Sequence, residues 1–135
     1  MKTLSGKLLE TITSRLVAEF QPEQVILFGS HAWGEPNAGS DVDLMVIVSH
    51  SDLSEYERAL RGHACLGDLA IAKDVMVKTR SEFDFFSEVR ASLEYKIAKH
   101  GKVLYAGEHV RQSVYMRTIA SQLFSQNCKP YVYAV

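Results

Sequence analysis

Apolar residues recur at every fourth position at the start of the chain, which is the pattern of a helix with one buried face. They are Leu4, Leu8, Ile12, Leu16 and Phe20. Because Pro22 disfavours helical geometry in the residue before it, this helix is predicted to end near Gln21. The strand-forming run at residues 25–28 (VILF) then predicts a short buried strand.

Two longer apolar segments predict the second and third strands. Residues 41–48 (DVDLMVIV) begin with two aspartates, and residues 69–79 (LAIAKDVMVKT) carry Asp74 in a mainly apolar run. Gly101 is predicted to end a helix, and residues 102–106 (KVLYA) predict a fourth, short strand.

A helix is predicted between the second and third strands, at residues 51–66. Asp52 and Glu55 have the spacing of a capping box, in which two side chains satisfy backbone groups at the start of a helix. One face of this helix would carry Leu53, Tyr56 and Leu60.

Further helices are predicted in the second half of the chain. Thr79 and Glu82 form another capping-box pattern, which predicts one or two helices across residues 80–100. Residues 108–126 again have helical periodicity, and residues 127–135 are predicted to be an extended tail.

Strands and helices alternate, so we predict an α/β (α+β) fold in which helices pack on a small mixed β-sheet. The chain has 135 residues, which is about one domain. Residues 1–106 would form that domain. Residues 107–135 would be a C-terminal helix and tail that serve as an appendage or an interface, including an interface between copies of the chain.

Composition narrows the class of protein. Hydrophobic residues make up 47% and charged residues 23%, as in soluble globular proteins. The net charge of -1 argues against a nucleic-acid binder that relies on bulk positive charge. No apolar run approaches the ~18 residues of a membrane span, and the N-terminus lacks a signal-peptide pattern. Cys65 and Cys128 lie far apart, which favours reduced thiols, so we expect a cytoplasmic protein.

The candidate chemistry begins with Asp41 and Asp43. Residues two apart on a strand point to the same side, so these two carboxylates would lie together and repel each other unless a cation separates them. Paired carboxylates suit Mg²⁺, which takes its remaining ligands from water and phosphates. Two unrelated aspartates in a solvated turn are the alternative, which the Asp-x-Asp pattern alone favours.

Gly29 and Ser30 directly follow the first predicted strand. Glycine lets a backbone approach a phosphate closely, and the serine N–H and hydroxyl can donate to phosphate oxygens. A simple turn is the alternative. The sequence contains neither the P-loop pattern GxxxxGK[ST] nor the nucleophile elbow GxSxG.

Asp74 is the third candidate, because a charged residue is costly in an apolar strand unless it is paired or metal-bound. If the third strand lies beside the second, Asp74 joins Asp41 and Asp43. Three carboxylates without a basic neighbour would then hold two metal ions about 3.5–4 Å apart. A surface position on an edge strand is the simpler interpretation of Asp74 alone.

These elements together form a recognisable motif: Gly29-Ser30, a gap of ten residues, Asp41-Val42-Asp43, and Asp74 on a later strand. The motif resembles the polymerase-β-type nucleotidyltransferase superfamily. Over residues 4–106 the short chain is similar to the minimal nucleotidyltransferase branch, called MNT. The resemblance implies the nucleotidyltransferase fold.

The resemblance also implies a role for each residue of the motif. Gly29 and Ser30 would hold the phosphates of a nucleoside triphosphate. Asp41 and Asp43 would ligate Mg²⁺, and Asp74 would bind a second Mg²⁺ and help deprotonate the acceptor hydroxyl. The reaction would transfer a nucleoside monophosphate, with ATP as the favoured donor, and would release pyrophosphate.

The loop departs from the family pattern at His31 and Trp33, where many relatives carry arginine. A cationic phosphate contact is therefore missing or comes from elsewhere. His31, beside Ser30, is itself a candidate for contact with the triphosphate. Trp33 could stack on a base, although packing within the loop is the favoured interpretation.

MNT proteins are commonly partnered with small helical HEPN proteins in toxin–antitoxin pairs. The resemblance implies an antitoxin that acts as a protein adenylyltransferase, with a tyrosine of a HEPN toxin as acceptor. The alternative is a non-catalytic module that blocks a HEPN ribonuclease by occlusion. An unrelated metal-dependent phosphatase is disfavoured by the Gly-Ser loop.

Overall fold

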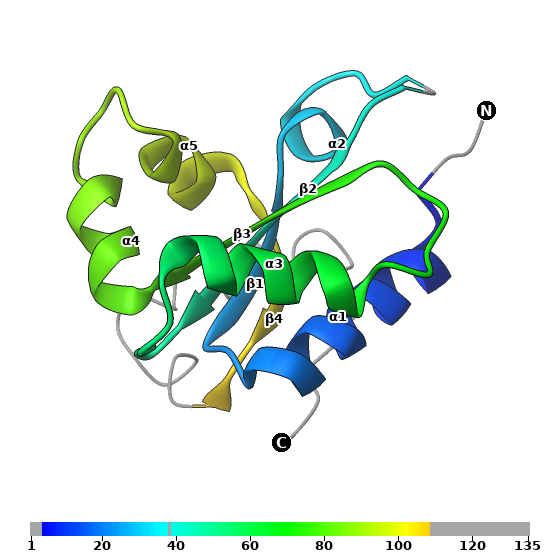
Figure 1. Cartoon of the computed structure of the whole chain (residues 1–135). Helices are drawn as coiled ribbons and strands as arrows, with labels where there is room; N and C mark the ends of the chain where they lie inside the picture. The colour runs from blue at the N-terminus through cyan, green and yellow to red at the C-terminus, as the bar shows by residue number, and fades with distance from the viewer. Residues whose placement is uncertain (1–3, 38, 109–135) are drawn as a thin grey trace.

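The strands β1 (Gln24–Phe28), β2 (Val42–Val48), β3 (Lys73–Thr79) and β4 (Lys102–Ala106) form one four-stranded sheet. Its order is β3-β2-β1-β4; β1 is antiparallel to β2 and β4, and β3 is parallel to β2. The computed structural model describes residues 4–37 and 39–108 (Figure 1). The mixed α/β sheet is confirmed, and most of the predicted C-terminal helix and the whole tail lie outside the described residues.

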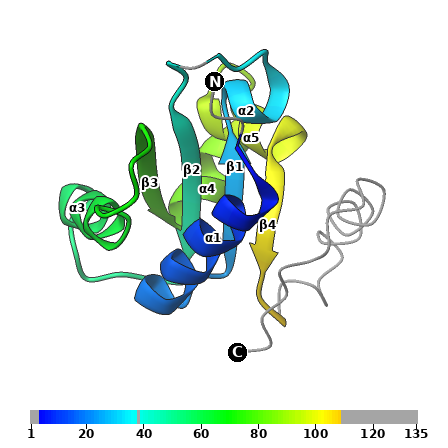
Figure 2. The ribbon, with the colours of Figure 1, turned by 90° about the vertical axis from the view of Figure 1, so that its right-hand side faces the viewer.

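Helices cover both faces of the sheet (Figure 2). On one face lie α1 (Gly6–Phe20) and α3 (Glu55–Cys65), and on the other lie α4 (Arg80–Ser87) and α5 (Leu93–His100). A single helical turn, α2 (Ser30–Trp33), follows β1. One or two helices were predicted across residues 80–100, and the structure has two there, α4 and α5.

The two central strands have apolar residues at nearly every position because both faces of the sheet are covered. Along β2, Leu44, Val46 and Val48 pack in the core beneath α1, whereas Met45 and Ile47 pack with Phe83 and Ile97 of α4 and α5. Strand alternation therefore places Asp43 on the α4–α5 face, at the end of the sheet where β2 begins.

The predicted third strand starts too early. Leu69 and Ile71 are in turns, and regular pairing with β2 begins at Lys73. Both apolar side chains nevertheless pack against the core on the α1 side of the sheet, which explains why this segment resembles a strand in sequence.

The capping box of α3 lies two residues further along the chain than the predicted one. Ser54 is the N-cap: its Oγ accepts a hydrogen bond from the Glu57 N–H at 3.2 Å, and the Glu57 carboxylate accepts one from the Ser54 N–H at 3.0 Å. Asp52 and Glu55 do not form the box. Both pairs have the required spacing, so the sequence pattern alone does not choose between them.

The inward face of α3 is consequently different from the predicted one. Tyr56 is 72% exposed and Leu60 is 51% exposed, whereas Arg58 and Gly62 are buried. A Cβ atom on Gly62 would lie 2.6 Å from Val75 Cγ1, so the helix approaches β3 more closely than a larger residue would allow. This close approach fixes which side of α3 faces the sheet.

Two side chains of α3 form hydrogen bonds with backbone groups on the outer edge of β3. The Val75 N–H donates to His63 Nε2 at 3.4 Å, and Arg58 donates to the Val77 carbonyl at 2.9 Å. Because β3 is the first strand in the sheet order, these groups face away from β2. Exposed edge strands are liable to pair with other chains, and side chains that cover them reduce that liability.

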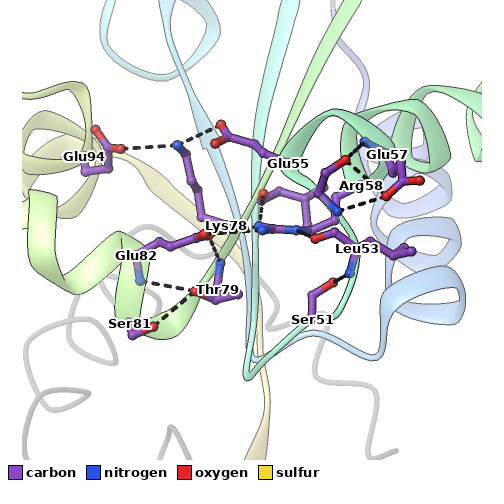
Figure 3. A network of polar contacts seen from close by, with 12 residues as sticks. Ser51, Leu53, Glu55, Glu57, Arg58, Lys78, Thr79, Ser81, Glu82 and Glu94 are labelled. Atoms are coloured by element: carbon purple, nitrogen blue, oxygen red, sulfur yellow. Dashed lines mark hydrogen bonds and ion pairs between the residues drawn. The ribbon is translucent and has the colours of Figure 1, made fainter.

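Arg58 also joins α3 to α4 (Figure 3). Its guanidinium forms a bidentate pair with Glu82, at 2.9 and 3.3 Å, and donates to the Leu53 carbonyl at 3.1 Å. Hydrogen bonds from Arg58 and from the Thr79 N–H lower the pKa of Glu82 to about 2. The predicted capping box of Thr79 and Glu82 is confirmed, so one carboxylate serves both the cap and the ion pair.

Candidate active site

Asp43 and Asp74 are direct register partners in the parallel pair of β2 and β3. Register partners on neighbouring parallel strands point to the same face, about 4.8 Å apart at the backbone. The third strand does lie beside the second, which is the condition under which Asp74 was expected to join the site, and the pairing brings two carboxylates together. Asp43 is partly buried, and the Asp74 side chain is 56% exposed on the edge strand.

The Asp43 carboxylate is in an unfavourable electrostatic environment. Burial raises its pKa most, the negative charges of Asp74 and Asp41 raise it further, and His31 opposes the shift. A cation bound beside the carboxylates would relieve both the burial cost and the repulsion.

Gly29 lies directly against Asp43. Its backbone has φ 74° and ψ −156°, a region that is essentially accessible to glycine alone. A Cβ atom at this position would overlap Asp43 Oδ2. Phe28 is the register partner of Asp43, so the end of β1 brings Gly29 to the carboxylate. The glycine is thus required both for its backbone conformation and for the space beside Asp43.

The turn α2 starts at Ser30, immediately after Gly29. It is closed by hydrogen bonds from the Trp33 N–H to the Gly29 carbonyl, at 3.0 Å, and from the Gly34 N–H to the Ser30 carbonyl, at 3.1 Å. The first N–H groups of a helical turn have no acceptor within it. Those of Ser30 and His31 are therefore available to a ligand at the end of β1.

His31 lies within α2, and Asp41 is the last residue of the loop that joins α2 to β2. His31 Nε2 lies 3.4 Å from the Ser40 carbonyl, so the ring connects α2 to the residue before Asp41. Asp41 is exposed and precedes β2, which starts at Val42. It is still close enough to raise the pKa of Asp43.

Within residues 4–37 and 39–108, no three His, Cys, Asp or Glu side chains are grouped closely enough to form a metal cluster. Mg²⁺ usually binds through one or two protein carboxylates and completes its shell with water and substrate phosphates. Asp43 with Asp74, and Asp41 beside them, supply hard oxygen donors of that kind. The donor set fits Mg²⁺ that binds together with a nucleotide.

The expectation that the three carboxylates have no basic neighbour is wrong. His63 Nε2 lies 3.8 Å from Asp74 Oδ1, and His63 Nδ1 hydrogen-bonds the Ala59 carbonyl at 2.9 Å. The sequence pattern does not single out His63 as part of the site. Its proximity to Asp74 depends on how α3 docks against the β3 edge, and no local pattern in the sequence encodes that.

Trp33 packs within the loop, as favoured from the sequence. Its ring lies 6.2 Å from the Phe28 ring, and the side chain contacts the core on the α4–α5 face. Lys96 of α5 places its ammonium 4.7 Å from the centre of the Trp33 ring. No sequence pattern associates Lys96 with this site, because Trp33 and Lys96 are far apart along the chain.

A comparison with known families agrees with this geometry. Residues 10–109 match the family described as Polymerase beta, Nucleotidyltransferase. The chain belongs to this nucleotidyltransferase family. The matched segment contains β1 to β4 and each residue of the candidate site.

The structure is also similar to solved structures. A proposed nucleotidyltransferase from Sulfolobus solfataricus has a TM-score of 0.54 at 20% identity, over 74% of this chain and 78% of that one. A toxin–antitoxin structure with AMP-PNP has a TM-score of 0.48 at 17% identity, over 89% and 90%. A mutant of the toxin–antitoxin MntA-HpeT has a TM-score of 0.47 at 16% identity, also over 89% and 90%. No curated protein matches the sequence.

The helices of the described part of the chain are too short or too polar to cross a bilayer. The longest, α1, has 15 residues, whereas a span needs about 20 apolar residues.

Proposed function

We propose that this nucleotidyltransferase moves a nucleoside monophosphate from a nucleoside triphosphate, with ATP as the donor, to a hydroxyl acceptor in a Mg²⁺-dependent reaction. The observation that supports it most is the pairing of Asp43 with Asp74, with Asp43 held against Gly29. It supports the proposal because carboxylates able to ligate Mg²⁺ lie beside a glycine backbone of the kind that can approach a phosphate closely. A structural turn would require neither feature.

Each side chain has a distinct part in this proposal. The backbone of Gly29 and the N–H and hydroxyl of Ser30 bind the phosphates, and His31 adds a contact to the triphosphate. Asp41 and Asp43 hold Mg²⁺, and Asp74 completes the site for a second ion. Bound there, Mg²⁺ would neutralise charge on the triphosphate and on the departing pyrophosphate.

The chemical step requires an in-line approach of the acceptor. The acceptor oxygen bonds to the α-phosphorus as the bond between that phosphorus and the oxygen bridging to the β-phosphate breaks, and pyrophosphate leaves. Asp74 receives the hydroxyl proton on a carboxylate oxygen. The exposed position of Asp74 on the edge strand supports this role, because an acceptor can reach its carboxylate from solution.

We infer further that the acceptor is a protein side chain, a tyrosine of a HEPN-type toxin, and that the chain acts as a cytoplasmic antitoxin. Its resemblance to the MNT branch supports this choice of partner. Residues 1–106 would be the catalytic unit and residues 107–135 would contribute to the interface with the toxin or with another copy of the chain.

A non-catalytic antitoxin is the second candidate, and one observation favours it. Phe85, Phe86 and Val89 are 69%, 43% and 48% exposed around the end of α4. Apolar side chains gathered on a surface in this way suit a binding face. The same face is compatible with an enzyme that must bind its protein substrate.

Labelled nucleotides separate the two candidates. The purified protein, alone and with any partner that co-purifies, is incubated with each labelled NTP and Mg²⁺. Transfer of label by the wild type, lost in Asp43→Asn and retained in Asp52→Asn, supports the enzyme. Asp52 is an exposed aspartate outside the candidate site and serves as the matched control. Partner binding that survives Asp43→Asn, without label transfer by the wild type, would establish the binding module instead.

A further inference from the structure

The loop after β1 presents no arginine or lysine to a bound triphosphate from residues 31–34. The structure brings a cation to this loop from another element. Lys96, in the first half of α5, holds its ammonium 4.7 Å from the Trp33 ring centre. The helices α2 and α5 lie at the same end of the sheet (Figures 1 and 2).

Lys96 lies at the end of a row of side chains that crosses one face of the sheet. Asp74 of β3 pairs in register with Asp43 of β2, which pairs in register with Phe28 of β1. Phe28 contacts Trp33, and Trp33 carries the Lys96 ammonium on its ring. This row carries the two carboxylates at one end and the Lys96 ammonium at the other, and Gly29 and Ser30 directly follow Phe28, which lies in the middle of it.

The charge of Lys96 is not consumed by an ion pair within the described part of the chain. By contrast, Lys78 of β3 and Arg80 of α4 are both paired with carboxylates. Lys96 instead contacts the face of an aromatic ring, and its side chain is exposed. A cation–π contact at an exposed site is a weak interaction, so a phosphate can compete for the ammonium.

We propose that Lys96 is a nucleotide-binding residue that contacts the triphosphate on the side opposite Asp43 and Asp74, with Trp33 as the platform that holds its ammonium in place. This inference rests on the proposed nucleotidyltransferase function. It assigns the positive contact to α5 in place of the loop. It also gives Trp33 a role in positioning a cation, in addition to its packing.

This arrangement has consequences for specificity. A lysine that contacts the outer phosphates strengthens the binding of ATP and contributes little to the binding of AMP. Loss of one charge-assisted contact is expected to weaken ATP affinity about tenfold. Arginine can restore much of the contact because it keeps the charge and also stacks on aromatic rings.

The full-length protein offers an internal probe for this test. Trp33 is the single tryptophan of the chain, so intrinsic fluorescence reports directly on the ring that Lys96 covers. Binding of Mg²⁺–ATP and of AMP is measured by calorimetry and by this fluorescence for the wild type, Lys96→Ala, Lys96→Arg and Lys99→Ala. Lys99 is the matched control, since it is an exposed lysine of α5 whose ammonium lies 5.5 Å from the Tyr95 ring centre.

The expected result is a loss of about tenfold in Mg²⁺–ATP affinity for Lys96→Ala, with AMP affinity unchanged, substantial recovery in Lys96→Arg, and no change in Lys99→Ala. The fluorescence change on addition of ATP should also be smaller in Lys96→Ala. If the wild type transfers nucleotide but Lys96→Ala binds Mg²⁺–ATP as tightly as the wild type, the role of Lys96 is overturned and the proposed function is not. A wild type that binds no Mg²⁺–NTP would overturn the proposed function, and this inference with it.

Discussion

The carboxylate of Asp43 fills the space in which Gly29 would carry a side chain. The backbone of Gly29 is also in a conformation that other residues avoid. Asp43 Oδ2, the atom that would overlap a Cβ atom at position 29, is thus also a candidate metal ligand. The backbone proposed to bind phosphate and the side chain proposed to bind metal are held together by the pairing of β1 with β2.

Gly29→Ala should damage the protein in two ways. Its strained backbone costs about 1–3 kcal/mol of stability, and its methyl group must displace the Asp43 carboxylate. We expect lower stability in urea denaturation together with loss of Mg²⁺–nucleotide binding. Gly39→Ala in the same loop is the control, since a Cβ there meets its nearest neighbour, Asn37 Oδ1, at an ordinary 3.5 Å. Unimpaired nucleotide binding by Gly29→Ala would contradict the assignment of this backbone to the phosphates.

Asp43→Asn should raise the melting temperature of the metal-free protein by a few degrees while abolishing nucleotidyl transfer. Burial, Asp74 and Asp41 all raise the pKa of Asp43, so its ionised form destabilises the folded state. The amide removes the charge and keeps the shape. Asp52→Asn, at an exposed site, should leave the melting temperature unchanged.

The pH dependence of this gain follows from the sign of the shift. A folded-state pKa above the unfolded one means that the penalty is present at neutral pH and disappears below the unfolded value of 3.8. The advantage of Asp43→Asn over the wild type should therefore shrink as the pH falls from 7 towards 3.8. If Asp43→Asn stabilised the protein equally at pH 7 and at pH 3.8, the gain would not come from removal of the Asp43 charge.

The contribution of Glu82 to stability should depend on pH in the opposite direction. Its pKa falls from 4.5 to about 2, so its contribution to stability is fully present above 4.5 and is lost as the pH falls towards 2. Glu82→Gln leaves the buried Arg58 guanidinium without its charged partner and should cost about 2 kcal/mol at pH 7. Denaturation curves at several pH values should show that the variant loses less additional stability than the wild type over this acidic range.

The observed face of α3 can be checked by substitution. Tyr56→Gln and Leu60→Gln lie on the exposed side and should each change stability by less than about 0.5 kcal/mol. Gly62→Ala should cost about 1–3 kcal/mol, because its methyl group would press α3 away from Val75. Large destabilisation by the glutamine variants would instead favour the helix face predicted from sequence.

Much of the fold follows from local patterns. Buried strands, an amphipathic first helix and the capping box of Thr79 and Glu82 all have short-range signals, and each is present in the structure. The alternation of β2 and the apolar setting of Asp74 pointed to Asp43 and Asp74 as one site only on the condition that β3 pairs with β2, which the structure supplies. The start and the buried face of helix α3 were harder to predict. Overlapping residue pairs satisfy the same capping pattern, and only packing against β3 selects one of them.

Contacts between distant parts of the chain account for what the sequence did not reveal. His63 reaches Asp74 because α3 docks at the edge of the sheet, and Lys96 reaches Trp33 because α5 returns to the end of β1. Neither pair has a characteristic spacing. Single-sequence patterns report helix faces and strand alternation well, but they do not report which surfaces of two elements meet.

The two α3 side chains on the outer border of β3 have a consequence for assembly. A foreign strand that extended the sheet there would first have to detach His63 from Val75 and Arg58 from Val77. Arg58 would then lose its place beside Glu82 as well. Backbone-mediated dimers, domain exchange and fibril growth are therefore all penalised on the side that carries Asp74, and a visiting macromolecule must recognise this border through its side chains.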